Sequence, residues 1–556
     1  MHSMILSLAG AISLITFCHF IIRRAKHTRL QLPPGPRGSL IFGVKQILPT
    51  IEPWKTYARW SEEFNDAVIS FRVYNRRVVV LNSASAITEL LEERANIYSD
   101  RPMSWMYNVI CGRGKAIFNI SSGDPRHKQY RRILQKGLGM RATRDYLPLI
   151  QQESARLAAG LLQNPGELTT HVQRNSAAVI MKVAFGYTIT DDDPFIKVAE
   201  EASKISGWAT QPGRWLVDHH PIIRFIPSWF PGAGWKRQGF EWRARLRYLS
   251  EVPHQWLRGQ MNSGTHADCF TSRLLAPEGG QTVSVEEEDA IKWAAGALYA
   301  GAGDTTVSAI ISFIRLMALH PKVQMKAQAE IRAAFGDALG AADKKEDSDP
   351  SQISRLPYLQ AILKEVLRFA PVGNLALPHR LTEDDVYRGY LIPKGATIIA
   401  NVWAVLHDPA IYPEPYKFSP ERFAPCEEEH HDHTHQPDPT QWAFGFGKRA
   451  CPGEHFAETT MLFAMVNILS RCTISLPKEA PIPVVEFTTG ITSHIKGFPI
   501  VVEPIRLDEF PPLVSAPASP PPAEDKPRPA RVPCVPRESD PIRNQDPPPQ
   551  DGWCWL

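Results

Sequence analysis

The stretch Phe444-Gly445-Phe446-Gly447-Lys448-Arg449-Ala450-Cys451-Pro452-Gly453 decides which fold we expect of this chain. Its glycines permit left-handed backbone and a close approach to a ligand, so they predict a tight loop. Residues 454–471 have helical composition, which places Cys451 near a helix N-terminus. The positive end of a helix dipole stabilises an anion and lowers the pKa of a thiol. A thiolate in apolar surroundings is suited to be an axial ligand of haem iron.

This loop resembles the haem-ligand motif of the cytochromes P450, Phe-x-x-Gly-x-Arg-x-Cys-x-Gly, and fills all of its fixed positions. The resemblance implies that Cys451 is the thiolate ligand of the iron of haem b. It also implies that Phe444 and Arg449 contact the cofactor, with Arg449 at a haem propionate. Taken alone, Cys451 would also fit a buried structural cysteine beside a helix, since free cysteines are commonly buried.

The chain has 556 residues and a formal net charge of +4, with 22% charged residues. That length allows one large domain or several. A near balance of charge lacks the basic footprint that nucleic-acid binding needs, so we expect no nucleic-acid partner. The eight cysteines are scattered without paired spacing, which argues against a disulfide framework or a zinc site and favours a reducing compartment.

The N-terminal segment, residues 1–29, is predicted to be a membrane anchor with a basic flank. Residues 4–22 are mostly apolar and are followed directly by basic residues. Their length is just enough to cross a bilayer, and the positive charge after them keeps the rest of the chain on the cytosolic side. A cleaved signal peptide would carry its basic residues before the apolar run, so we expect a retained single-pass anchor.

Two further segments follow the anchor. The resemblance to the P450s covers residues 30–505, which are expected to form one catalytic domain. It implies a mainly α fold with a small β-sheet domain, and a cytosolic catalytic domain at the endoplasmic reticulum membrane. Residues 506–556 are rich in proline, which predicts a disordered tail because such a composition cannot bury a core.

A second motif lies in the apolar run 286–320, which is predicted to be one long helix. Its centre reads Gly301-Ala302-Gly303-Asp304-Thr305, and each glycine inside a helix costs about 1 kcal/mol relative to alanine. The run resembles the long-helix motif of the P450s, which implies that Asp304 and Thr305 manage protons during oxygen activation. Small residues at the centre of this helix open a groove on its surface. Ala302 stands where the family usually has glycine, and its methyl group could narrow this groove. The alternative is helix packing with Thr305 bonded to a carbonyl of its own helix.

Basic residues at three positions are candidate partners of the haem propionates. His127 and Arg131 lie four apart, on one face of a predicted basic helix. They resemble the family pattern Trp-Arg-x-x-Arg, with His127 in place of Trp; a solvated basic face is the alternative. His379 matches a further family position whose basic side chain meets a propionate, and Arg380 is the competing candidate.

A structural network is also implied by the resemblance. Glu365 and Arg368 lie three apart on a predicted helix over 359–369, and Arg422 follows downstream in Pro-Glu-Arg-Phe. Alone, such a pair is most often a solvated surface pair. The resemblance implies a buried Glu365–Arg368–Arg422 network that braces the core behind the haem.

The reaction implied is insertion of one oxygen atom from O2 into a lipophilic small molecule. Electrons would come from NADPH through the membrane-bound NADPH–cytochrome P450 reductase, since the chain shows no flavin or nucleotide motif of its own. Residues 213–218 and 229–233 resemble fungal P450s of secondary metabolism, which favours a terpenoid, polyketide or indole-type substrate. The alternatives are a xenobiotic-oxidising P450, a thiolate-haem isomerase or peroxide-using enzyme, and a non-catalytic haem-binding protein.

Overall fold

The computed structural model describes residues 30–505, except for 278–281, 337–349 and 426–435. These residues belong to one compact unit. The expected anchor at 1–29 and tail at 506–556 lie outside the described residues, so both boundaries of the catalytic domain stay predictions.

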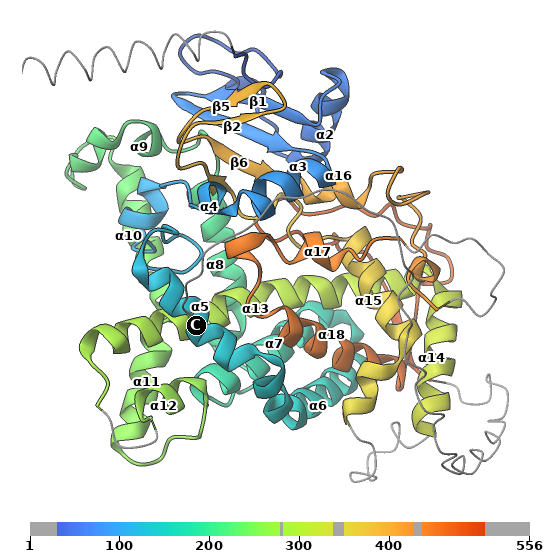
Figure 1. The fold of residues 1–556 in the computed structure, drawn as a ribbon. Coiled ribbons are helices and arrows are strands. Elements are labelled where there is room, and N and C mark those ends of the chain that lie inside the picture. The colour runs from blue at the N-terminus through green and yellow to red at the C-terminus, as the bar shows by residue number, and fades with distance from the viewer. Residues whose placement is uncertain (1–29, 278–281, 337–349, 426–435, 506–556) are drawn as a thin grey trace, which may run out of the picture. The chain divides into compact units, whose positions relative to one another are not determined.

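A four-stranded sheet joins the first part of the chain to a segment more than 300 residues later (Figure 1). Its strand order is β1-β2-β6-β3, with β2 and β6 parallel and the other two pairs antiparallel. The strands are β1 (Val68–Val73), β2 (Arg76–Leu81), β6 (Thr397–Ala400) and β3 (His379–Arg380). Their β-branched residues favour this extended, half-buried surface. The sheet places His379 beside the N-terminal strands.

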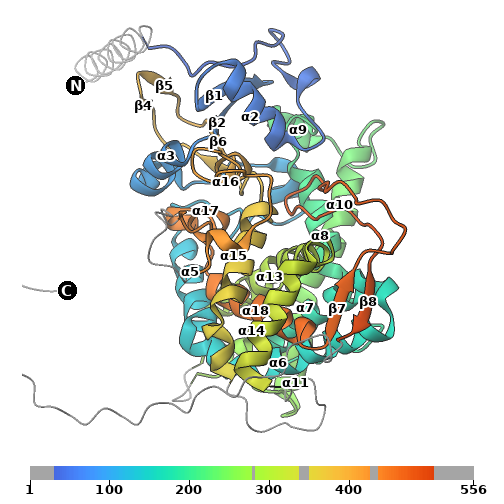
Figure 2. The ribbon, with the colours of Figure 1, turned by 90° about the vertical axis from the view of Figure 1, so that its right-hand side faces the viewer.

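Two small hairpins complete the strands. The pair β4 (Asp385–Tyr387) and β5 (Tyr390–Ile392) is antiparallel, as is the pair β7 (Cys472–Ser475) and β8 (Val501–Pro504). Figure 2 shows the second hairpin beside the helical part of the molecule, away from the four-stranded sheet.

Helices make up most of the described chain, as expected for a mainly α protein. They are α2 (Pro53–Glu63), α3 (Ala84–Ile87), α4 (Ala95–Tyr98), α5 (Pro125–Leu138), α6 (Met140–Gln163), α7 (Leu168–Phe185), α8 (Phe195–Thr210), α9 (Leu216–His219), α10 (Gly234–Leu246), α11 (Glu251–Asn262), α12 (Phe270–Leu275), α13 (Val285–Leu319), α14 (Pro321–Phe335), α15 (Pro357–Phe369), α16 (Val402–Leu406), α17 (Thr440–Ala443) and α18 (Glu454–Leu469).

The central helix α13 matches the helix predicted over 286–320. It begins at a capping box, in which Ser284 Oγ accepts from the Glu287 amide at 3.2 Å and Glu287 Oε2 accepts from the Ser284 amide at 3.0 Å. Among the described residues it is the one helix long and apolar enough to cross a membrane, but 83% of its apolar stretch is buried inside the protein. It is therefore a core helix.

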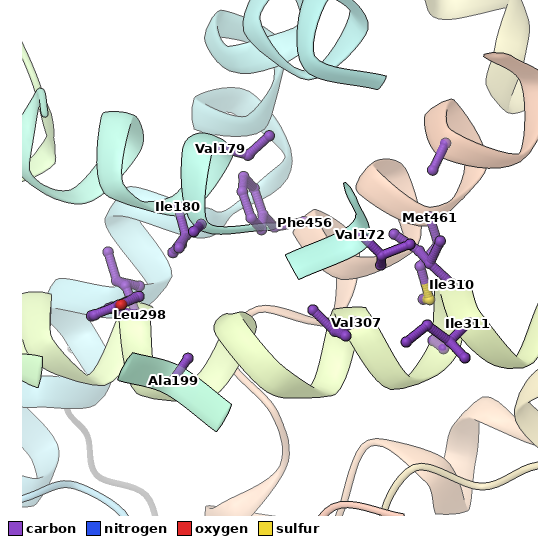
Figure 3. Close-up of a cluster of buried hydrophobic side chains, with 14 of the residues drawn as sticks. Val172, Val179, Ile180, Ala199, Leu298, Val307, Ile310, Ile311, Phe456 and Met461 are labelled. Atoms are coloured by element: carbon purple, nitrogen blue, oxygen red, sulfur yellow. The ribbon is translucent and has the colours of Figure 1, made fainter. Parts of the chain in front are cut away.

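The core forms where α13 packs against α7, α8 and α18. Figure 3 shows apolar side chains of all four helices close together around α13, and each of the labelled ones is buried. The labelled residues are Val172, Val179, Ile180, Ala199, Leu298, Val307, Ile310, Ile311, Phe456 and Met461. This packing holds the middle of α13 opposite the start of α18, where the Cys451 loop ends.

Candidate active site

The loop from Phe444 to Gly453 connects α17 to α18 and is closed on itself. Gly445 and Gly447 adopt positive φ angles of 79° and 49°, the left-handed region that favours glycine. A Cβ on Gly447 would also lie 2.5 Å from the carbonyl oxygen of Leu91. The Cys451 amide donates to the Phe444 carbonyl at 2.7 Å. The two glycines therefore allow the turn that presents Cys451 just ahead of α18.

The Cys451 thiol is accessible, whereas the other described cysteines are buried. Burial of its surroundings raises the pKa of the thiol, and the negative charge of Glu454 adds to this, against the Gly453 amide and Arg131. The amide of Gly453 at the helix start does lower this pKa, as expected, but burial outweighs it and the net shift is upward. A metal deprotonates a thiol that coordinates it, so a bound metal would favour the thiolate of Cys451.

Arg449, two residues before Cys451, is held by backbone carbonyls of the segment 99–120. Its guanidinium donates to the carbonyl oxygens of Ser99 at 2.8 Å, Ile117 at 2.9 Å and Ile120 at 2.6 Å. Burial lowers its pKa to about 10. The arginine thus binds the 99–120 segment to the Cys451 loop while its other N–H groups stay available.

His127 and Arg131 project from α5 toward the same loop. Arg131 Nη1 donates to the carbonyl oxygen of Ala450. His127 is 6% exposed, and its Nε2 has no hydrogen-bond partner within the described residues. Burial and the positive charges of Arg449 and Arg131 lower the pKa of His127 to about 4, so the ring is neutral near pH 7.

His379, and not its neighbour Arg380, turns toward these basic residues. His379 is 3% exposed and donates from Nδ1 to the Tyr98 carbonyl at 2.9 Å. Burial and the charge of Arg101 lower its pKa to about 3. Arg380 is instead paired with Asp100, with Nε 2.9 Å from Oδ2. The structure therefore separates the two candidates that the sequence left open.

Arg101 belongs to the same site and was missed in the sequence. Its Nη1 donates to the carbonyls of Leu377 at 2.6 Å and Pro378 at 2.7 Å, while its buried Nε has no partner within the described chain. Burial and the charge of Arg449 lower its pKa to about 9. Its partners lie 276 and 277 residues later, so no local pattern could have pointed to them.

The basic side chains from these separate segments influence one another's pKa, which shows that they lie close together. The set comprises Arg101, His127, Arg131, His379 and Arg449. Their acidic neighbour Asp100 is already paired with Arg380. Buried like charges are unfavourable unless an anion neutralises them. The unpartnered His127 Nε2 and Arg101 Nε, together with the accessible thiol of Cys451, fit a dianionic group whose metal takes a thiolate, as haem does.

The middle of α13 leaves Thr305 accessible although its neighbours are buried. Thr305 Oγ1 donates to the carbonyl of Gly301 at 2.6 Å, which is the contact that the helix-packing alternative requires. A Cβ on Gly301 would lie 3.5 Å from Phe118 Cζ, whereas one on Gly303 would lie 2.4 Å from the Cβ of Ala199 on α8. The first glycine therefore lies beside Phe118, and the second allows α8 to pack closely.

Asp304 points away from this accessible side and is 4% exposed. His494 Nε2 lies 3.3 Å from Asp304 Oδ1. Burial would raise the pKa of Asp304, but the hydrogen bond and charge of His494, with hydrogen bonds from Ser203 and Thr492, bring it below the usual value. His494 has no motif of its own in the sequence.

The residues predicted for the structural network do lie together. Arg368 donates to both oxygens of Glu365, at 2.7 and 2.9 Å, and both side chains are fully buried. Arg422 Nε lies 3.5 Å from Glu365 Oε1. Burial raises the pKa of Glu365, and the charge of Arg368 opposes that shift. This pair is therefore not the solvated surface pair that its spacing alone would favour.

A helical fold with a thiol loop and buried cations above it defines a haem-thiolate class of protein, and comparisons with known proteins give the family. A model of the cytochrome P450 family matches residues 33–502. The chain therefore belongs to the cytochrome P450 family. A zebrafish cytochrome P450 solved with abiraterone has the same fold, with a TM-score of 0.62 at 21% identity over 82% of this chain and 100% of that chain.

Curated relatives narrow the class further. Cytochrome P450 monooxygenase claR of Ampulloclitocybe clavipes is 35% identical over 89% of each chain. Cytochrome P450 monooxygenase 208 of Postia placenta is 34% identical, over 90% of this chain and 96% of its own. Tryptamine 4-monooxygenase of Psilocybe cyanescens is 33% identical, over 86% and 94%. The protein is thus a cytochrome P450 monooxygenase, an oxidoreductase with haem iron as its implied cofactor, and not the isomerase or non-catalytic alternative.

Proposed function

We propose that this protein uses O2 and electrons from NADPH to hydroxylate a lipophilic product of fungal secondary metabolism. The observation that carries the proposal is the meeting of the accessible Cys451 thiol with buried basic side chains that lack an anion of their own. Haem, when bound, supplies the reductive activation of O2 and the transfer of one oxygen atom.

Individual residues would hold that cofactor as follows. Cys451 would bind the metal, and Phe444, at the start of the same loop, packs against the main core. Arg101, Arg131 and Arg449 would neutralise the carboxylates, and His127 and His379 lie among these arginines. The neutral ring of His127 can donate an N–H from Nε2, because burial keeps the ring unprotonated. The neutral ring of His379 already donates its single N–H from Nδ1 to the Tyr98 carbonyl, so this ring lines the site without donating to a carboxylate.

Proton handling is assigned to Asp304 and Thr305. Thr305 donates its hydroxyl proton to Gly301, but its oxygen can still accept a hydrogen bond on the accessible side. Asp304 is held ionised by its surroundings, so it can take up a proton and pass it on.

The substrate class rests on the apolar loop and on the relatives. In the segment 105–118, Met106, Ile110 and Ile117 are buried in the main core, and Phe118 packs against this core beside Gly301. An apolar pocket favours a lipophilic molecule. One relative is named tryptamine 4-monooxygenase. Of the three substrate classes favoured by the sequence, namely terpenoid, polyketide and indole-type, this name supports the indole type.

Membrane attachment is supported by two exposed apolar segments. Leu40 and Ile41 are 92% and 69% exposed, and Ile222 and Trp229 are 75% and 77% exposed. The His219 carbonyl at the end of α9 accepts from Asn75 Nδ2 at 2.9 Å, which connects α9 to the turn between β1 and β2. Such a surface suits a membrane interface, next to the predicted single-pass anchor in the endoplasmic reticulum and a membrane-bound reductase.

The central test is spectroscopic. Reduced protein treated with carbon monoxide should absorb at about 450 nm, as expected of a thiolate ligand. Cys451→Ser should lose this band, whereas Cys472→Ser, at a buried cysteine in β7, should keep it. Folded, haem-loaded wild type without the band would contradict the proposal. For the substrate, deletion of the gene should cause a less oxidised metabolite to accumulate, and that metabolite should gain one labelled oxygen atom from labelled O2 in microsomes with reductase.

A further inference from the structure

Asp304, the buried acid of the α13 motif, is held by side chains from two other parts of the chain. His494 Nε2 lies 3.3 Å from Asp304 Oδ1. The hydroxyl groups of Ser203 on α8 and of Thr492 also lower the pKa of the carboxylate, and their oxygens lie 3.2 Å apart. The carboxylate therefore lies beside a histidine and two hydroxyl groups, of which only the histidine can carry a positive charge.

His494 differs from Asp304 in its access to solvent. The Asp304 side chain is 5% exposed, whereas that of His494 is 23% exposed. Because the carboxylate has little contact with water, a neighbouring titratable group can carry protons to it. The imidazole has two ring nitrogens, and one can face the carboxylate while the ring exchanges a proton with water.

The position of His494 is fixed by its turn. The His494 amide donates to Thr488 Oγ1 at 3.0 Å, and the His494 carbonyl accepts from the Thr488 amide at 2.8 Å. The preceding Ser493 donates its amide to Val372 at 2.8 Å, and its carbonyl accepts from Ser308 Oγ on α13. The turn that carries the His494 ring is thus hydrogen-bonded to α13 at Ser308, four residues after Asp304.

We propose that His494 positions Asp304 and delivers protons from solvent to it during turnover. The inference rests on the proposed role of Asp304. In the step, the protonated ring gives its Nε2 proton to Asp304 Oδ1 and becomes neutral; it then takes a proton from water. Asp304 passes the proton toward Thr305 and returns to the carboxylate form.

The reaction needs such a supply. Insertion of one oxygen atom from O2 consumes two electrons and two protons, and leaves one water molecule. Thr305 donates its own hydroxyl proton to the Gly301 carbonyl, so the protons that the reaction consumes have to reach it from another group. The Asp304–His494 contact connects the α13 motif to a partly exposed titratable group.

The test compares variants that separate charge, hydrogen bonding and fold. His494→Gln keeps a donor but does not titrate. Lys496→Gln is the matched control, because Lys496 lies two residues away, is 52% exposed and pairs with Glu486 at 2.8 Å. Each variant is first checked for the carbon monoxide band and for its thermal unfolding. The probe is ethoxycoumarin, or another lipophilic aryl ether that the wild type oxidises.

With NADPH and reductase, His494→Gln should form product at least about tenfold more slowly, with more peroxide released per NADPH. When hydrogen peroxide replaces NADPH and O2, the oxidant already carries the two protons, so the same variant should match the wild type. Lys496→Gln should match it in both assays. A loss that persists with peroxide would mean a merely structural role and would overturn the proposal.

Asp304→Asn separates this inference from the proposed function. If Asp304→Asn is impaired with NADPH and His494→Gln is not, the role of His494 is wrong while that of Asp304 stands. If Asp304→Asn is itself unimpaired, the proton-handling role of Asp304 fails. The double variant should be no slower than Asp304→Asn alone, because both changes interrupt one path.

Discussion

At the scale of single residues, several histidines are buried in the neutral form. Burial lowers the pKa of His127 and His219 to about 4, and that of His379 and His407 to about 3. Two of them belong to the candidate haem site. His407 does not: its ring stacks on Trp403 with centroids 4.5 Å apart, and its Nδ1 donates to the Trp403 carbonyl at 3.0 Å.

We expect His407 to make the protein less stable as the pH falls. In the unfolded chain a histidine binds a proton below about pH 6.5, but in the folded protein His407 stays neutral down to about 3. Between these values the unfolded state binds more protons, so the free energy of unfolding falls by up to about 1.4 kcal/mol for each pH unit lost.

His407→Gln should therefore flatten the pH dependence of the free energy of unfolding between pH 4.5 and 6.5, by up to about that slope. Val405→Ala in the short helix α16, which ends just before His407, is the control. It removes a buried apolar side chain, so it should lower stability at every pH and leave the slope as it is. Chemical denaturation at several pH values gives both quantities. Equal slopes for His407→Gln and wild type would contradict the assignment.

At the scale of elements, the contact between α8 and α13 depends on which glycine faces it. Gly303 meets Ala199 on α8, with no room for a further Cβ, while Gly301 meets only Phe118 at an ordinary contact distance. The sequence treats the two glycines as equivalent parts of one groove. In the structure Gly303 allows α8 to pack against α13, whereas Gly301 lies beside Phe118 with room for a methyl group.

Gly303→Ala should destabilise the protein by about 1–3 kcal/mol, because the new methyl group overlaps α8. Gly301→Ala should be neutral or stabilising by up to about 1 kcal/mol, since alanine is the better helix former and the space is free. Thermal unfolding of both variants tests this difference. Adding Ala199→Gly should restore stability to Gly303→Ala more than it changes the wild type; simple additivity would exclude the proposed overlap.

At the scale of the whole molecule, the buried Glu365–Arg368 pair connects α15 to distant loops. Arg368 Nη1 donates to the carbonyls of Leu406 at 2.8 Å and Pro415 at 2.9 Å, and Glu365 Oε1 accepts from the Ser419 amide at 2.8 Å. One buried guanidinium therefore donates hydrogen bonds both to the Glu365 carboxylate and to two backbone carbonyls.

Arg368→Lys should cost about 3–5 kcal/mol of stability, because an ammonium cannot reach all of these acceptors. Lys364→Gln is the matched control on the same helix. Lys364 pairs with Asp438 at 2.7 Å, but both side chains are more than a third exposed, so its loss should cost less than about 1 kcal/mol. Denaturant titration compares the two. Similar losses in both variants would mean that burial of the pair does not matter.

Local patterns in the sequence were sufficient for the main architecture. The Cys451 loop, the helix α13 with its central motif and the helix α15 were all predicted within a few residues. The P450 family and its monooxygenase class are confirmed by the comparisons. These features depend on residues a few positions apart, so spacing, capping and glycine conformation are enough to indicate them.

Tertiary structure alone decided which charges meet. It brought Arg101 to Arg449, turned His379 rather than Arg380 toward the site, and joined His494 to Asp304. It also reversed the expected pKa shift of the Cys451 thiol, because burial outweighs the helix N-terminus. Burial and electrostatic interaction depend on distance in space and not along the chain, which is why the sequence determined the ligand loop of this protein but not the environment of its sulfur.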